Sequence, residues 1–91
     1  MRAKEIAQAV VDHYRTTLDK LKASTTRPMR VKQVMIYLLR SYTGLTNRGI
    51  GGLLGMNYSA VSKAGSTIEH LMKVDNRVKQ TIKEIVSSFE V

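Results

Sequence analysis

Residues 46–68 read TNRGIGGLLGMNYSAVSKAGSTI, and they carry the clearest structural pattern in the chain. A short helical pattern ends at Gly55, and a longer helical pattern begins after Asn57. A helix-turn-helix needs a small residue where its two helices touch and a residue that tolerates a positive φ in its turn. Gly51 and Gly55 supply both. The stretch therefore predicts a helix-turn-helix, and the alternative is an ordinary helical hairpin.

The positive charge of the chain is concentrated around this stretch. No Asp or Glu occurs between positions 20 and 68, whereas eight basic residues do: Lys20, Lys22, Arg27, Arg30, Lys32, Arg40, Arg48 and Lys63. The other basic residues lie at the two ends with all the acidic ones and cancel them, so the centre carries the whole net charge of +8. A surface of one sign attracts polyanions, of which nucleic acid is the commonest. A basic surface that only maintains solubility usually mixes both signs.

Helical periodicity runs through nearly the whole chain, and no window alternates with period two. The expected N-caps are Thr17, Thr46, Asn57 and Asp75, and the expected helix ends are Gly44 and Gly55. The expected apolar stripes are Ile6, Ala9, Val10, His13 and Tyr14; Leu18 and Leu21; Val31, Val34, Met35, Leu38 and Tyr42, widened by Ile36, Tyr37 and Leu39; Ile50, Leu53 and Leu54; Tyr58, Val61, Ala64, Ile68, Leu71 and Met72; and Val78, Ile82, Ile85, Val86 and Phe89. We expect an all-α fold of about five to six helices, in one domain over residues 1–91 with its helix-turn-helix core at 46–73.

The N-terminal end of the second helix of this unit carries the predicted base contacts, Tyr58, Ser59, Ala60, Ser62 and Lys63. Recognition helices present this end to base edges in the major groove. Serine hydroxyls donate or accept, the alanine methyl suits thymine, and lysine suits phosphate or guanine. The alternatives are a core role for Tyr58 and simple solvent exposure for Ser62. The predicted interface also includes three residues around the first helix and the turn: Thr46, Arg48 and Asn57.

The sequence resembles the C-terminal DNA-binding domain of the bacterial replication initiator DnaA. The family's signature Phe-Gly-Gly-Arg-Asp-His-Thr-Thr-Val corresponds to residues 54–61, LGMNYSAV, which are one residue shorter. The likeness extends over nearly the whole chain, through residues 37–43 and back to residues 10–21, VVDHYRTTLDKL. The resemblance implies a TrpR-like helical fold and binding to double-stranded DNA.

The chain departs from the family at the positions that read bases. The family's Arg-Asp-His is Met56-Asn57-Tyr58 here, and its paired threonines are Ser59-Ala60. The resemblance therefore does not carry over the initiator's own box sequence. Residues 56–64, MNYSAVSKA, look more like the initiator-like domain at the C-terminus of some transposases that act on repetitive palindromes. Both a transposase and a replication-initiator-like protein stay open as the context of this domain.

A basic loop, residues 22–30 or KASTTRPMR, precedes the central helix and contains the only proline. In the resembled family this loop places an arginine in the minor groove, which here implies Arg27. Arg30 and Lys32 lie closer to the helix start, where we expect them to meet phosphates. The alternative is a solvated loop without DNA contacts.

The sequence gives little support for a nucleotide-binding, metal-binding or catalytic site. The glycine-rich segment 47–55 lacks the Gly-Lys-Ser/Thr of a phosphate loop, so we expect no nucleotide cofactor. The chain has no cysteine, and its two histidines are far apart, so we expect no metal site. We also expect no catalytic residue, no membrane association, a monomeric domain and a cytoplasmic, nucleoid-associated location. The competing function is a helical protein-interaction adaptor whose helix-turn-helix is only structural.

Overall fold

Six helices make up the chain in the computed structural model, which describes residues 3–23 and 30–89. They are α1 (Ala3–His13), α2 (Leu18–Ala23), α3 (Arg30–Tyr42), α4 (Asn47–Leu54), α5 (Tyr58–Val74) and α6 (Asn76–Phe89). No strand occurs in these two ranges. The predicted all-α fold and the predicted number of helices are confirmed.

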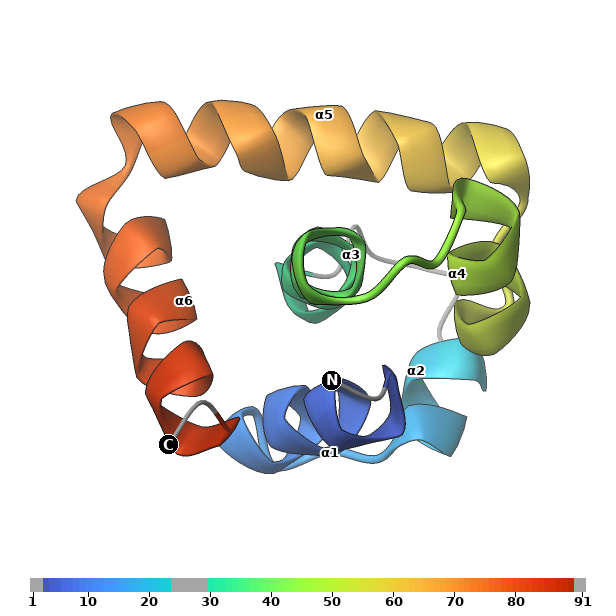
Figure 1. Ribbon diagram of the computed structural model, residues 1–91, viewed down its shortest axis with the longest axis horizontal. Helices are drawn as coiled ribbons and strands as arrows, with labels where there is room; N and C mark the ends of the chain where they lie inside the picture. The colour runs from blue at the N-terminus through green and yellow to red at the C-terminus, as the bar shows by residue number, and fades with distance from the viewer. Residues whose placement is uncertain (1–2, 24–29, 90–91) are drawn as a thin grey trace.

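The central element is α3, which Figure 1 shows end-on, with the other helices arranged around it. In this view α5 lies above α3, α4 and α2 lie on one side, α6 lies on the other, and α1 lies below. Helix α3 packs against α1, α4 and α5, while α6 closes the ring by contacting α1 and α5. Such a surrounded helix must be apolar on most of its faces, as the sequence of α3 is.

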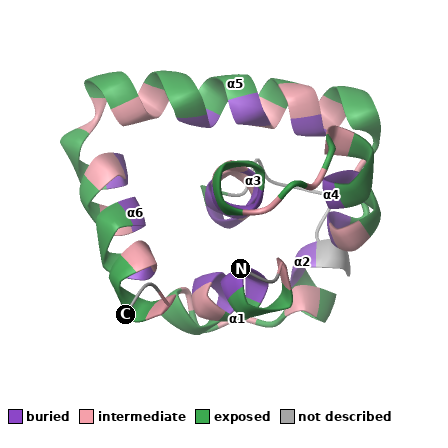
Figure 2. Cartoon of the chain, viewed as in Figure 1, coloured by how far each residue is buried: buried purple, intermediate pink, exposed green. Residues whose placement is uncertain are grey.

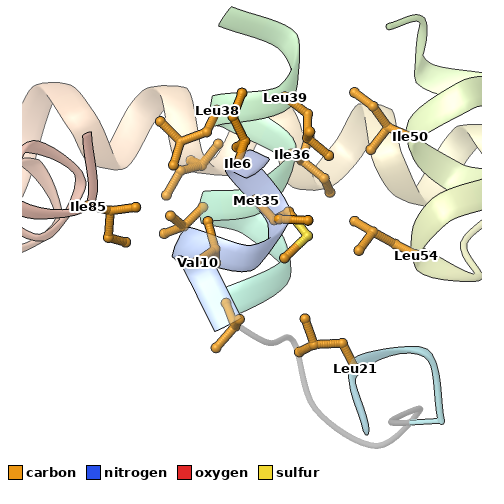
Figure 3. Packing of buried hydrophobic residues seen from close by; sticks show 14 of the residues in the cluster. Ile6, Val10, Leu21, Met35, Ile36, Leu38, Leu39, Ile50, Leu54 and Ile85 are labelled. Carbon is orange, nitrogen blue, oxygen red and sulfur yellow. The ribbon is translucent and has the colours of Figure 1, made fainter. Parts of the chain in front are cut away.

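The core is formed by buried residues of all six helices. Figure 2 shows that the buried segments of α1, α4, α5 and α6, in purple, lie on the sides of these helices that face α3. Figure 3 shows Met35 and Ile36 facing α4, where Ile50 and Leu54 point back at them, while Ile85 approaches from α6. All five of these side chains are at most 1% exposed. Truncating a buried aliphatic side chain to alanine typically costs about 2–5 kcal/mol. The position of the functional site thus depends on α3.

Local capping groups begin the helices where the sequence predicts. The Thr17 hydroxyl accepts from the backbone N–H of Lys20 at 3.2 Å, just before α2. At the start of α6, Asp75 Oδ1 accepts from the backbone N–H groups of Arg77 and Val78 at 2.9 and 3.4 Å. These side chains satisfy N–H groups that the first turn of a helix leaves without a partner.

Helix α3 ends at Tyr42, two residues before Gly44, so the predicted end of the helix is confirmed, although Gly44 does not have the positive φ of a left-handed cap. The helix ends instead through Thr43, whose hydroxyl donates to the Leu39 carbonyl and accepts from the Leu45 N–H at 3.1 Å. A threonine side chain competes in this way with backbone hydrogen bonds. The predicted burial of Tyr42 is wrong: it is 36% exposed and meets Phe89 edge-on, with ring centroids 5.5 Å apart.

Candidate nucleic-acid interface

The turn between α4 and α5 depends on two glycines, as predicted. Gly55 has φ 68° and ψ 34°, the left-handed conformation that glycine adopts without a steric penalty. The backbone N–H groups of Gly55 and Met56 both point to the Gly51 carbonyl, the latter at 2.8 Å. A β-carbon on Gly51 would overlap the carbonyl oxygen of Met56. The turn therefore needs a residue without a side chain at Gly51.

The two predicted contact residues Thr46 and Asn57 are N-caps in the structure. Thr46 Oγ1 accepts from the Gly49 N–H at 3.2 Å, and Asn57 Oδ1 accepts from the Ala60 N–H at 2.8 Å. Their acceptor oxygens are thus used within the protein. The Asn57 amide group still offers two N–H donors.

The N-terminal turns of α5 present three of the predicted base contacts to solvent. Tyr58 is 58% exposed, and Ser59 and Lys63 are also exposed. Ala60 and Ser62 are half-buried, and Val61 is fully buried against the core. The alternative role of Tyr58 as a core aromatic residue is therefore wrong. Because Val61 is fixed in the core, the face of α5 that carries the neighbouring exposed residues is turned away from the core.

The exposed side of α5 continues beyond the residues that the sequence singled out. Ser66 and Thr67 are exposed one turn after Lys63, and the Thr67 hydroxyl donates to the Lys63 carbonyl at 3.0 Å. Their spacing from Ser59 and Lys63, at steps of three, four and seven residues, was a signal available in the sequence. Both residues extend the polar face of the helix.

A cation from another helix lies against α5. A β-carbon on Gly65 would overlap Nη1 of Arg40 and would lie 3.4 Å from Arg40 Cζ. Gly65 follows Tyr58 by seven residues and Ser62 by three, so all three share one side of α5. The guanidinium of Arg40 thus continues the line that begins at Tyr58. Arg40 belongs to the acid-free basic segment, but the sequence alone did not place it beside α5.

The remaining predicted cations are distributed over two other helices. Arg48 is exposed on α4, and Arg30 is the exposed first residue of α3, where its Nη1 donates to Gln33 Oε1 at 2.9 Å. Lys32 is half-buried on α3. Arg27 lies outside the described residues, and so does most of the predicted basic loop. Since α3 rises about 1.5 Å per residue, Arg30 and Arg40 lie at opposite ends of it, roughly 15 Å apart.

The described part of the chain contains no group of three or more His, Asp or Glu side chains that could hold a metal ion. No helix in residues 3–23 and 30–89 is both long and apolar enough to cross a membrane.

A family model described as the bacterial DnaA-protein helix-turn-helix matches residues 3–68, which cover α1 to most of α5. No curated protein matches the chain. The matched segment contains the turn at Gly51 and Gly55, the capped α5 and the central α3. The chain therefore belongs to the family of bacterial DnaA helix-turn-helix domains, and it is a DNA-binding domain.

Proposed function

We propose that this domain binds duplex DNA with the N-terminal end of α5 in the major groove. The exposure of Tyr58, Ser59 and Lys63 on the first two turns of α5 is the observation that carries the proposal. These side chains project from a helix whose inner face is fixed by Val61 and whose start is fixed by the Asn57 cap. A major groove about 12 Å wide admits one helix of this kind.

The side chains on α5 divide into two chemical groups. Ser59 supplies a hydroxyl, and Tyr58 supplies a ring and a phenolic hydroxyl for base edges. Lys63 supplies a flexible point charge that suits phosphate. Phosphate contacts fix the register of the protein on the duplex, whereas contacts to base edges select the sequence.

Arg40 is a further proposed phosphate contact. Its guanidinium lies beside Gly65, about 10 Å along α5 from Tyr58 at 1.5 Å per residue. A planar guanidinium can donate two parallel hydrogen bonds to one phosphate. The DNA backbone would then be contacted by Lys63 from α5 and Arg40 from α3, while the N-terminal end of α5 contacts the bases.

The loop before α3 is the proposed minor-groove contact, with Arg27 as the inserted residue. Two observations support this contact: the basic composition of the loop, and the position of its last residue, Arg30, at the start of α3. A narrow, A·T-rich minor groove concentrates negative potential and favours an inserted arginine.

Selection of bound sites from a random duplex pool, followed by a salt titration on the selected site, tests the proposal. About four to six phosphate contacts give a slope of log K against log salt of about −4 to −5. We expect the pool to converge on one major-groove sequence flanked by A·T pairs. A slope near zero, or failure to bind any duplex at low salt, would show that the exposed end of α5 is not a DNA-reading surface.

A further inference from the structure

Two arginines that are far apart in the sequence line one small cavity between the first turns of α3, the first turns of α6 and Tyr14, the residue that follows α1. The cavity has a volume of about 240 Å³. Arg30 contributes from the first residue of α3, and Arg77 contributes from the first turn of α6. The other lining residues are Tyr14, Val34, Asp75, Val78 and Thr81. The helix-turn-helix contributes none of these side chains.

The polar groups of this cavity are mainly hydrogen-bond donors. Burial raises the pKa of Tyr14 above its ordinary value, although the nearby Arg30 acts in the opposite direction. The Tyr14 hydroxyl is therefore protonated at neutral pH and can donate. Arg30 uses Nη1 towards Gln33, and its guanidinium carries further N–H groups. Thr81 adds a hydroxyl.

Asp75 is the one carboxylate in the lining, and its role is structural. Its Oδ1 accepts the two N–H bonds that begin α6, from the backbone of Arg77 and Val78. The carboxylate thus serves the helix start, and the two arginines and one carboxylate of the lining together carry a net charge of +1. A site with two guanidinium groups and two hydroxyls suits a phosphate group.

We propose that Arg30 and Arg77 form a phosphate pocket that grips the DNA backbone outside the helix-turn-helix, on the flank of the site beyond the minor-groove loop. This inference rests on the proposed function. Arg30 follows Arg27 by three residues, a reach of at most about 10 Å of chain. If the loop enters the minor groove, the adjacent phosphates therefore lie close to the pocket.

The pocket also extends the proposed DNA interface to α6, which lies outside the segment that matches the family model. The family model matches residues 3–68, and Arg77 lies after that segment, on α6. Figure 1 shows α6 on the opposite side of α3 from α4, so the pocket lies well away from the turn of the helix-turn-helix. A phosphate held there would stand outside the part of the duplex that α5 reads.

The test compares Arg77→Ala with Lys83→Ala, which removes the same charge from an exposed position on α6 that does not line the cavity. Each protein is titrated with two forms of the selected duplex. One ends at the loop side of the site, and one continues for about five base pairs, roughly 17 Å at 3.4 Å per step.

On the long duplex, we expect Arg77→Ala to lower affinity about 3- to 10-fold and to make the salt slope shallower by about 0.9, the value of one phosphate. Lys83→Ala should change both quantities less, and Arg77→Lys should retain part of the affinity. On the short duplex, Arg77→Ala and the unmodified protein should bind alike. Thermal unfolding checks that each variant is folded.

The inference is overturned if Arg77→Ala matches Lys83→Ala on the long duplex, or if its loss of affinity is the same on both duplexes. In either case the unmodified protein still binds in a salt-dependent manner, and the proposed function stands. If the unmodified protein binds neither duplex, both proposals fall together.

Discussion

The guanidinium of Arg40, from α3, occupies the place that a side chain at Gly65 would take on α5. Helix α5 therefore carries at this position a cation that its own sequence does not encode. A β-carbon added at Gly65 would lie 3.7 Å from Ile36 Cγ2, which is an ordinary van der Waals distance. The core would therefore tolerate a methyl group at this position. The overlap concerns only the flexible end of an arginine.

Gly65→Ala should therefore separate stability from DNA binding. Alanine in a helix is more favourable than glycine by about 1 kcal/mol, so we expect unchanged or slightly higher stability in a urea titration. The methyl group displaces Arg40, so DNA affinity should fall, as it should in Arg40→Ala. The double variant should be no weaker than Arg40→Ala alone. Additive losses in the double variant would contradict the coupling between the two residues.

Gly51→Ala should destabilise the domain, whereas Gly52→Ala should not. The new β-carbon at Gly51 meets the Met56 backbone carbonyl, which cannot move without distorting the turn. Overpacking of this kind costs about 1–3 kcal/mol. A β-carbon on Gly52 meets no atom within 4 Å, so its substitution should stabilise α4 by about 0.5–1 kcal/mol. Chemical denaturation of both variants measures the difference, and equal stabilities would show that the turn can adapt.

Short-range features of this fold could be predicted from the sequence, because the interacting groups are neighbours in the chain. Thr46 and Asn57 cap the residues three positions ahead, and Gly55 adopts its left-handed conformation within its own turn. At Gly44 the sequence predicted where α3 ends but not how, because the adjacent Thr43 hydroxyl supplies hydrogen bonds in place of a left-handed glycine. The distribution of charged residues predicted nucleic acid as the class of partner, because the segment without Asp or Glu can be recognised without knowing the fold.

Features that depend on how helices cross could not be predicted. Arg40 reaches Gly65 only because α3 passes beneath α5, and periodicity within α3 contains no information about that crossing. Arg30 and Arg77 line one cavity for the same reason. Tyr58 has helical spacing with the buried stripe of α5, yet it is exposed, whereas Val61 on the same first turn is fully buried.

Two substitutions of Asn57 should show whether this residue caps α5, contacts a base, or does both. Asn57→Ala removes the bond to the Ala60 N–H and should cost about 1 kcal/mol of stability, measured by thermal unfolding. Asn57→Ser retains a capping oxygen and should be nearly as stable as the unmodified protein. If the serine variant nevertheless selects a different DNA sequence, the amide N–H groups read a base. An unchanged selected site would restrict Asn57 to capping.

The initiator's own box should not be a high-affinity site for this domain. The family reads that box at positions occupied here by Met56, Asn57, Tyr58 and Ala60, and each lost base contact costs about 1–3 kcal/mol. A competition experiment between the box and the selected duplex measures the ratio of affinities directly. Tight binding to the box that resists the selected competitor would mean that the changed residues make equivalent contacts.

Substitutions on the exposed end of α5 should divide into two classes. Tyr58→Ala and Ser59→Ala remove exposed groups that we propose contact the base edges, so they should change which sequence a random pool yields more than they change affinity for unselected DNA. Lys63→Ala should weaken binding to all sequences alike and make the salt slope shallower by about 0.9, because a phosphate contact carries no sequence information. Glu69→Gln, an exposed change near the middle of α5, serves as the control for altered charge on the same helix. If the Tyr58, Ser59 and Lys63 variants all keep the original site preference and affinity, α5 does not enter the groove, and the bases are read by another part of the domain.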